Sequence, residues 1–367
     1  MARMSVGQRI AFTATILVPA LAVVGYFAWF FSAPLRGRPE SQVFVIVLLS
    51  ILFEAFPFVL IGAFAAAAIE VLMTPEQVQR LVPRNRLLSV VMGALLGVLF
   101  PVCECGVIPV VRRLIRKGVP LPAAVSYLLA APIVNPIVIV STIIAFRGGS
   151  ESLVVPVLRV TLGVGIAVIV GLLLSWVGHA EDLLQAGARP QPSPTPLPSG
   201  EGKGEAVADP PGEAAATGEA AAALPATGWD RAEAILAHAA VEFVDVGRFL
   251  VLGSVIAAST QTFVPRQMLL ALGANLPASI LVMMGLAFVL SLCSEADAFV
   301  ARSFVQFTTA AKLSFLVLGP MLDIKLLFMY LSAFRRRLIL TIVLAVVVLN
   351  FGAGLIVGLV LRTIGAG

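Results

Sequence analysis

The three cysteines of this 367-residue chain lie at breaks in otherwise apolar sequence, where they could bind a soft solute. Cys103 and Cys105 stand in "FPVCECGVIP", and Cys293 stands in "LSLCSEADAF". Thiolate sulfur is the soft donor among side chains, so three converging thiols would suit a thiophilic metal or metalloid. The alternative is that each cysteine only packs as a small buried hydrophobe. We predict that the three thiols converge and bind substrate.

Carboxylates accompany the cysteines at both breaks. Glu104 separates the first two cysteines, and Glu295 and Asp297 follow Cys293. A carboxylate at membrane depth is costly and commonly serves a proton relay or a solute pathway. We therefore predict that these three carboxylates couple transport to protons. At the second break the alternative is a capping box, in which Ser294 and Asp297 begin a helix.

Two further segments place a proline and a polar residue at matching positions inside apolar runs. They read "AAPIVNP", which ends with Asn135 and a proline, and "LGPMLDIK", which contains Asp323. Proline inside a helix frees a backbone carbonyl, so Asn135 and Asp323 are predicted to bind substrate, with a packed kink as the alternative. Lys325 follows Asp323 by two residues, a spacing that does not place both on one helical face. Solvation at helix ends is the expected role of four other charged residues: Glu54, Glu242, Asp245 and Arg248.

The composition is that of an integral membrane protein. Hydrophobic residues make up 59% of the chain and charged residues 12%, against about 25% charged in soluble domains. The apolar runs are continuous, which favours helices over a barrel. The net charge of +5 sits at the ends of these runs, where it sets orientation, so we expect the lipid bilayer, and no nucleic acid, as a partner. Walker and HExxH motifs are absent, and we expect neither an enzyme nor a cofactor.

The chain contains two similar halves. At an offset of 190 residues Cys103 aligns with Cys293 and Arg112 with Arg302, and with a small adjustment Asn135 aligns with Asp323. We predict an all-α fold in which each half has about three transmembrane helices and one re-entrant hairpin. An odd number of spans inverts the second half, a transporter signature. The predicted half-helices are 87–102 and 106–117 in the first half, and 277–292 and 296–311 in the second.

The predicted organisation has four parts. These are an N-terminal transmembrane helix and loop (1–41), a first membrane repeat (42–177), a disordered linker rich in Pro, Ala, Gly and Glu (178–230), and a second membrane repeat (231–367). The positive-inside rule places the N-terminus and the linker in the cytoplasm.

Three long motifs resemble a known family. They are "FPVCECGVIPVVRRLIRKGVPLPAAVSYLLAAPIVNP", "LCSEADAFVARSF" and "FLVLGPMLDIKLL". They resemble the bacterial predicted-permease family that contains the organoarsenical efflux permeases, and the resemblance covers nearly all of the chain except the first helix and the linker. It implies a polytopic inner-membrane permease. For the characterised branch it also implies export of trivalent organoarsenicals, with Cys103, Cys105 and Cys293 as the substrate thiols.

The leading prediction is therefore a secondary active permease that exports a small thiophilic solute and is coupled to protons. One alternative is a membrane thiol-redox protein that passes electrons through the cysteines. Another is a permease for a different sulfur-containing or anionic solute. The sequence leaves oligomerisation open.

Overall fold

A computed structural model describes residues 39–74, 77–78, 83, 85–99, 102–148, 151–176, 228–263 and 275–363. The predicted N-terminal helix and residues 178–227 of the predicted linker lie outside these residues. The described part is helical. In the first half the helices are α2 (Pro39–Leu72), α4 (Arg86–Leu99), α5 (Glu104–Arg116), α6 (Leu121–Val134), α7 (Pro136–Ala145) and α8 (Val154–Trp176). In the second half they are α9 (Gly228–Phe263), α11 (Leu276–Leu290), α12 (Asp297–Ser303), α13 (Thr309–Met321), α14 (Ile324–Ala333) and α15 (Arg336–Thr363).

Five helical segments are long and apolar enough to cross a membrane. They are Gln42–Leu72, Leu121–Ala145, Val154–Trp176, Thr309–Ala333 and Arg336–Thr363. Two of them are broken in the middle, between α6 and α7 and between α13 and α14, at the predicted proline segments. The apolar helices α4 and α11 have 14 and 15 residues, about 21–23 Å at 1.5 Å per residue, and fall short of a bilayer core of about 30 Å.

The second arm after Cys293 is shorter than predicted. The sequence pattern predicts a half-helix over 296–311, but α12 ends at Ser303. Phe304 leaves the helical conformation and packs edge-to-face against Phe307 and Phe315. Thr308 then accepts a hydrogen bond from the Ala311 amide and begins α13. The aromatic contacts and this new cap stop α12 after two turns.

The chain reverses direction between α4 and α5. Gly93 packs on the backbone of Ala123, and Gly97 packs on that of Ala131, so α4 runs parallel to α6. A four-residue turn, 117–120, joins α5 to α6. The two helices pack against each other, so α5 runs in the direction opposite to α6. The end of α4 and the start of α5 therefore meet at one level of the molecule, inside it.

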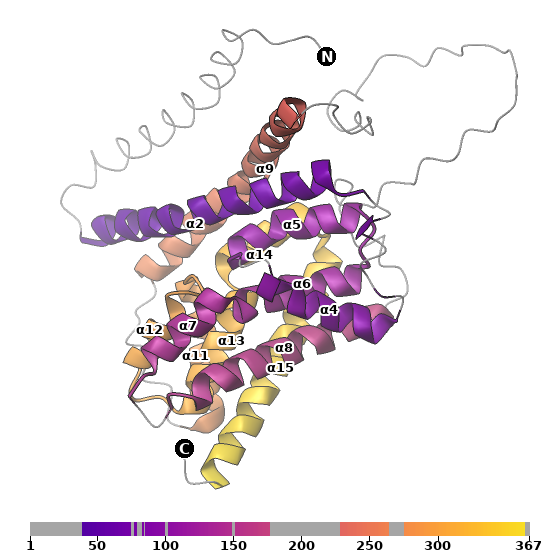
Figure 1. The fold of residues 1–367 in the computed structure, drawn as a ribbon. Coiled ribbons are helices and arrows are strands. Elements are labelled where there is room, and N and C mark those ends of the chain that lie inside the picture. The colour runs from indigo at the N-terminus through magenta and orange to yellow at the C-terminus, as the bar shows by residue number, and fades with distance from the viewer. Residues whose placement is uncertain are drawn as a thin grey trace, which may run out of the picture.

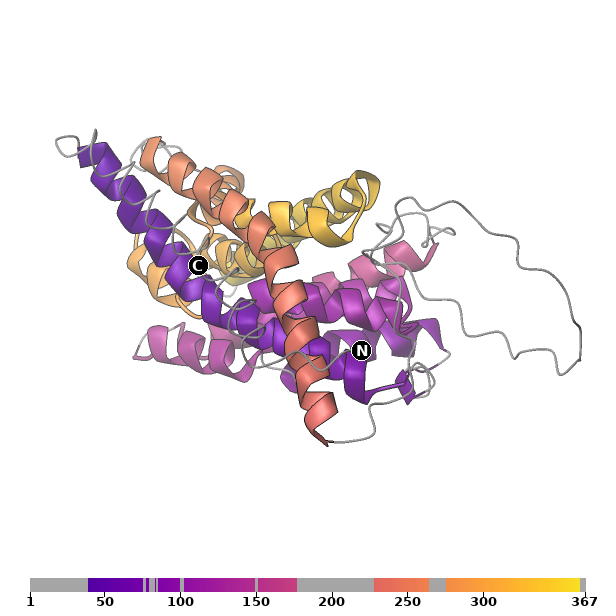
Figure 2. The same cartoon turned by 90° about the horizontal axis from the view of Figure 1, so that it is seen from above.

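The helices α2 and α9 lie against each other on one side of the molecule and cover α5 and α14 (Figures 1 and 2). Phe56 meets Phe243 edge-to-face, while Ile51 packs with Ala257. Residue numbers thus rise along one helix as they fall along the other, and α2 and α9 run antiparallel.

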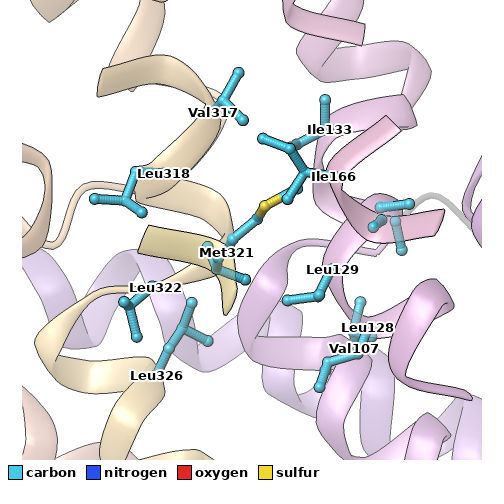
Figure 3. Close-up of a cluster of buried hydrophobic side chains, with 14 of the residues drawn as sticks. Val107, Leu128, Leu129, Ile133, Ile166, Val317, Leu318, Met321, Leu322 and Leu326 are labelled. Atoms are coloured by element: carbon cyan, nitrogen blue, oxygen red, sulfur yellow. The ribbon is translucent and has the colours of Figure 1, made fainter. Parts of the chain in front are cut away.

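The two halves share one hydrophobic core. Figure 3 shows Met321 of the second half reaching toward Ile133 and Ile166 of the first half, with further aliphatic side chains on both sides. Met321 and Ile133 are fully buried. Because these side chains come from positions far apart in the chain, burying them fixes one half against the other and sets the distance between the two cysteine-bearing breaks.

Candidate functional site

Two short segments bring the cysteines into the core. The first tip, Val102 and Cys103, precedes α5, and the second tip, Ser291–Ala296, joins α11 to α12. Cys103 is the N-cap residue of α5 and has extended backbone angles. Ser291 ends α11 with a left-handed φ of 45°, which turns the chain sharply toward the first tip.

Cys103, Glu104 and Cys293 form a close group, which contains two of the three thiols that we predict to converge. Their ligand atoms all lie within 4.8 Å of one another, and all three residues are buried. A soft, thiophilic atom could therefore contact two thiols and one carboxylate from the two halves at once. Cys105 is also fully buried, two residues into α5, but it does not belong to this group.

Glu104 is held from the second half of the chain. Its Oε1 accepts a hydrogen bond from Lys325 Nζ at 3.1 Å, and its Oε2 accepts one from Ser294 Oγ at 3.0 Å. Lys325 Nζ also donates to the Ser291 carbonyl at 3.2 Å and lies 3.6 Å from Asp323 Oδ2. Because a buried charge needs an opposite charge and hydrogen bonds, this network stabilises ionised Glu104 beside the thiols.

Glu295 is the carboxylate next to the Cys293 thiol. The thiol donates to Glu295 Oε2 at 2.7 Å, and the half-buried side chain has no described ion pair. Its other oxygen, Oε1, is buried and accepts no hydrogen bond. Asp297 Oδ1 is likewise buried without a hydrogen bond, but Asp297 is paired with Arg159. Of these two acids, Glu295 is thus the one with no described ion pair.

Asn135 and Asp323 both begin a helix after a break. Asn135 Oδ1 accepts from the Ile137 amide and caps α7, and Asp323 Oδ1 accepts from the Leu326 amide and caps α14. The helical spacing of Lys325 and Asp323 does not keep them apart, because Lys325 Nζ lies 3.6 Å from Asp323 Oδ2. Asp323 has extended angles and stands before the helix, so helical spacing does not govern the pair. Asp323 reaches the cysteine site through Lys325, whereas the contact of Asn135 stays within its own break.

Asp297 pairs with Arg159, a residue that the sequence reasoning missed. Arg159 donates to Asp297 Oδ2 at 2.7 Å, to the Ser294 carbonyl at 3.3 Å and to Thr142 Oγ1 at 2.8 Å. A single arginine in the apolar run "VVPVLRVTLGVG" was the available signal. The capping-box alternative is wrong, since Ala296 is the N-cap of α12 and no side chain caps it; the Ser294 hydroxyl serves Glu104 instead.

Ion pairs join the halves at both ends of the molecule. At one end Arg113 of α5 contacts Glu242 of α9 at 3.0 Å and Glu70 of α2 at 3.4 Å. At the other end Glu151 contacts Arg302 at 3.2 Å and Lys312 at 3.3 Å. The expected solvation of Glu242 is wrong, because this side chain is buried and paired. These pairs anchor the outer ends of α5 and α12, whose inner ends carry the site.

Apolar spans around a buried centre of thiols and ion pairs define a multi-pass membrane protein. Residues 41–359 match the family described as a predicted permease, and the chain belongs to this ArsP-type permease family. It is 42% identical to the UPF0718 protein YcgR of Bacillus subtilis (strain 168) over 85% of this chain and 95% of that protein. It is 38% identical to a putative two-component membrane permease complex subunit of Streptococcus mutans serotype c over 81% of this chain and 89% of that protein.

No solved structure matches the chain. Membership of a permease family indicates a transporter rather than an enzyme, and it confirms the family predicted from the three long motifs.

Proposed function

We propose that the chain is a secondary active permease that exports small thiophilic solutes, with trivalent organoarsenicals as the best candidate class. The solute binds at Cys103, Cys293 and Glu104, with Cys105 next along the pathway. The observation that carries this proposal is the approach of two thiols and one carboxylate, from separate halves of the chain, to within 4.8 Å in the buried interior.

The same contacts support an inverted-repeat architecture with re-entrant hairpins. Cys103 and Cys293 are equivalent positions at the offset of 190, and so are Glu104 and Ser294, whose side chains hydrogen-bond to each other. Equivalent residues can touch only near the axis that relates two repeats. The antiparallel course of α2 and α9, which are also equivalent helices, fits a two-fold axis in the membrane plane.

The chemistry of the pair suits a trivalent arsenical. A hydrated monosubstituted arsenical carries two As–OH groups, and each thiol can replace one of them. Two As–S bonds form, two As–O bonds break, and the thiol protons leave in two water molecules. The step is reversible by hydrolysis and needs no oxidant, so the site can bind the solute and then release it.

Proton coupling is proposed for Glu295, with Asp297 and Glu104 as supporting carboxylates. Lys325 binds Glu104, and Arg159 binds Asp297. Glu295 touches the Cys293 thiol and keeps one oxygen without a hydrogen bond. It is therefore the acid best placed to pass the Cys293 thiol proton to the leaving As–OH group, which departs as water. Asn135 and Asp323 are proposed as pathway residues, because each begins the second segment of a broken span.

An efflux assay tests this function. Cells that lack their own arsenic exporters are loaded with methylarsenite, and its retention is measured with and without the chain. We expect Cys103→Ser and Cys293→Ser to abolish export, and Cys105→Ser to lower it less, because Cys105 stands outside the closest group. If both of the first two variants export like the parent chain, the thiol pathway is wrong.

A thiol-redox function is the second candidate, and the proximity of Cys103 and Cys293 favours it. It predicts a reversible disulfide and no solute export. The anionic-solute alternative fits less well. Glu104, Glu295, Asp297 and Asp323 surround the tips, and among the residues that the structure describes only Lys325 and Arg159 pair with them. An anion would meet these carboxylates.

The inner membrane of a bacterium is the proposed location, with the N-terminus and residues 178–230 in the cytoplasm. The Streptococcus mutans relative is named as a subunit of a two-component complex. We therefore propose that a second membrane subunit could assist this chain. Export from a host that expresses this chain alone would show that the chain needs no such subunit.

A further inference from the structure

Glu54 is a carboxylate in an unusual place on α2. The candidate span runs from Gln42 to Leu72, so Glu54 lies about 18 Å from one end and about 27 Å from the other at 1.5 Å per residue. This position is well inside a hydrocarbon core of about 30 Å. Nevertheless its side chain is exposed on the surface of the described molecule.

Glu54 stands at the border between two faces of α2. One turn further along the packed face lies Phe58, whose carbonyl approaches Gly106, and the next turn brings Gly62 against Gly106. On the outward face Phe53 is 76% exposed and Ile61 is 54% exposed. The helices α2 and α5 run in the same direction. Glu54, which lies one turn before Phe58, is therefore at the level of the first tip.

The neighbours of Glu54 belong to the cysteine site. Glu54 lies on α2 at the level of the first tip, where the ligand atoms of Cys103, Glu104 and Cys293 all lie within 4.8 Å of one another. The charges of Lys325, Glu104 and Glu295 act on its carboxylate. Cys293 itself is 2% exposed. The half-buried Glu295 accepts a hydrogen bond from this thiol, and the exposed Glu54 lies further out at the level of the tips. They form a polar connection from a buried thiol to an outer surface that is otherwise apolar.

We propose that Glu54 marks a lateral route by which solutes dissolved in the bilayer reach Cys293. The outer part of the route is lined by the apolar side of α2, and its inner part by Glu54 and Glu295. Such a route admits neutral, lipid-soluble, thiol-reactive solutes with an apolar substituent, and it excludes charged ones. The identity of the transported solute rests on the proposed function, whereas the route to the thiol does not.

Thiol labelling in proteoliposomes tests the route without any transport. The Cys103→Ser/Cys105→Ser variant leaves Cys293 as the single thiol. We expect an apolar maleimide that partitions into the bilayer to label it at least ten times faster than a charged, membrane-impermeant maleimide added to both sides. Equal or faster labelling by the charged reagent would overturn the lateral route.

Blocking variants locate the opening. Glu54→Trp places a bulky ring at the level of the tips and is expected to slow labelling by the apolar reagent at least five-fold. Phe53→Trp adds a ring at the neighbouring residue on the outward face of α2, and it is expected to leave the rate of labelling by the apolar reagent unchanged. Equal rates in both variants would overturn the assignment to Glu54. If the double cysteine variant does not fold, mass spectrometry of the labelled parent chain resolves Cys293 from the other thiols.

The result separates this inference from the proposed function. Apolar labelling of Cys293 that depends on Glu54 supports the route even if methylarsenite efflux is absent. Efflux that requires the cysteines, with Cys293 reached only by the charged reagent, supports the permease and rejects the route.

Discussion

At the scale of single residues, the site depends on buried charges that are paired across the two halves. Lys325 is 2% exposed and Glu104 is 1% exposed, and their charged atoms lie 3.1 Å apart. Removing one partner from such a pair leaves an uncompensated charge in a medium of low polarity, whereas removing both restores neutrality. The pair therefore positions Glu104 beside the thiols. Loss of one partner should first lower the free energy of unfolding.

Substitution of Lys325 tests this pairing. Lys325→Met should lower the free energy of unfolding by about 3–5 kcal/mol, because Glu104 is left buried and unpaired. Glu104→Gln/Lys325→Met should recover most of this loss. The measurement is the unfolding midpoint of the purified protein in detergent, with Lys117→Met as the matched control at the partly exposed end of α5. A double variant no more stable than the single one would contradict the pairing.

Residue-level partners were the hardest part to predict. The sequence singles out the three cysteines and Glu104 because they interrupt apolar runs, and it does not show that Cys105 lies outside the close group of Cys103, Glu104 and Cys293. It does not reveal that Lys325 binds Glu104 or that Arg159 binds Asp297, since these pairs span 221 and 138 positions of the chain. Only the packing of α14 against α5, and of α7 and α8 near α12, brings them together.

At the scale of elements, glycines set how closely the helices approach the site. A Cβ on Gly62 would lie 2.3 Å from the Gly106 carbonyl oxygen, which is shorter than real contacts allow. The first turns of α5 can therefore lie directly against α2. This contact holds the helix that begins at Cys103.

Gly62→Ala tests the contact. Forcing a methyl group into this crossing should cost about 1–3 kcal/mol, as overpacking does, and should lower efflux by displacing α5. Gly165→Ala in α8 is the matched control, because its added Cβ meets nothing within 4 Å, and it should be neutral or slightly stabilising. The measurement is the unfolding midpoint of both variants. Equal midpoints would show that α2 and α5 do not pack so closely.

The elements themselves were largely predictable. Apolar runs gave the spans, and the proline segments gave the breaks before α7 and α14. The short α12 was not predictable from the hydrophobic pattern, because Phe304 and Phe307 continue the apolar run while packing in a non-helical turn. The spacing of Ser294 and Asp297 suggested a capping box that does not form. The Ser294 hydroxyl instead donates a hydrogen bond to Glu104 of the other half.

At the scale of the whole molecule, the two halves of the chain are held together by contacts between them. The buried contact of Met321 with Ile133 and Ile166 (Figure 3), the pairing of α2 with α9, and the ion pairs at both ends all cross between them. None of these contacts requires residues 178–227. Association should therefore survive a break in that segment.

Expression of the halves as separate chains tests this. Residues 1–177 and 228–367 made together should co-purify on a tag carried by either chain, and the pair should retain methylarsenite efflux at a reduced level. An unrelated membrane protein with the same tag is the control. Recovery of each half alone would contradict a core shared between the halves.

The central claim is that Cys103 and Cys293 meet and bind one soft atom between them. The most direct measurement treats the purified chain with a monosubstituted trivalent arsenical, digests it, and identifies arsenic-bridged peptides by mass spectrometry. The account predicts one arsenic joining the peptide of Cys103 to that of Cys293, with loss of the bridge in Cys293→Ser and its persistence in Cys105→Ser. A bridge confined to Cys103 and Cys105, or arsenic attached to single thiols alone, would contradict it.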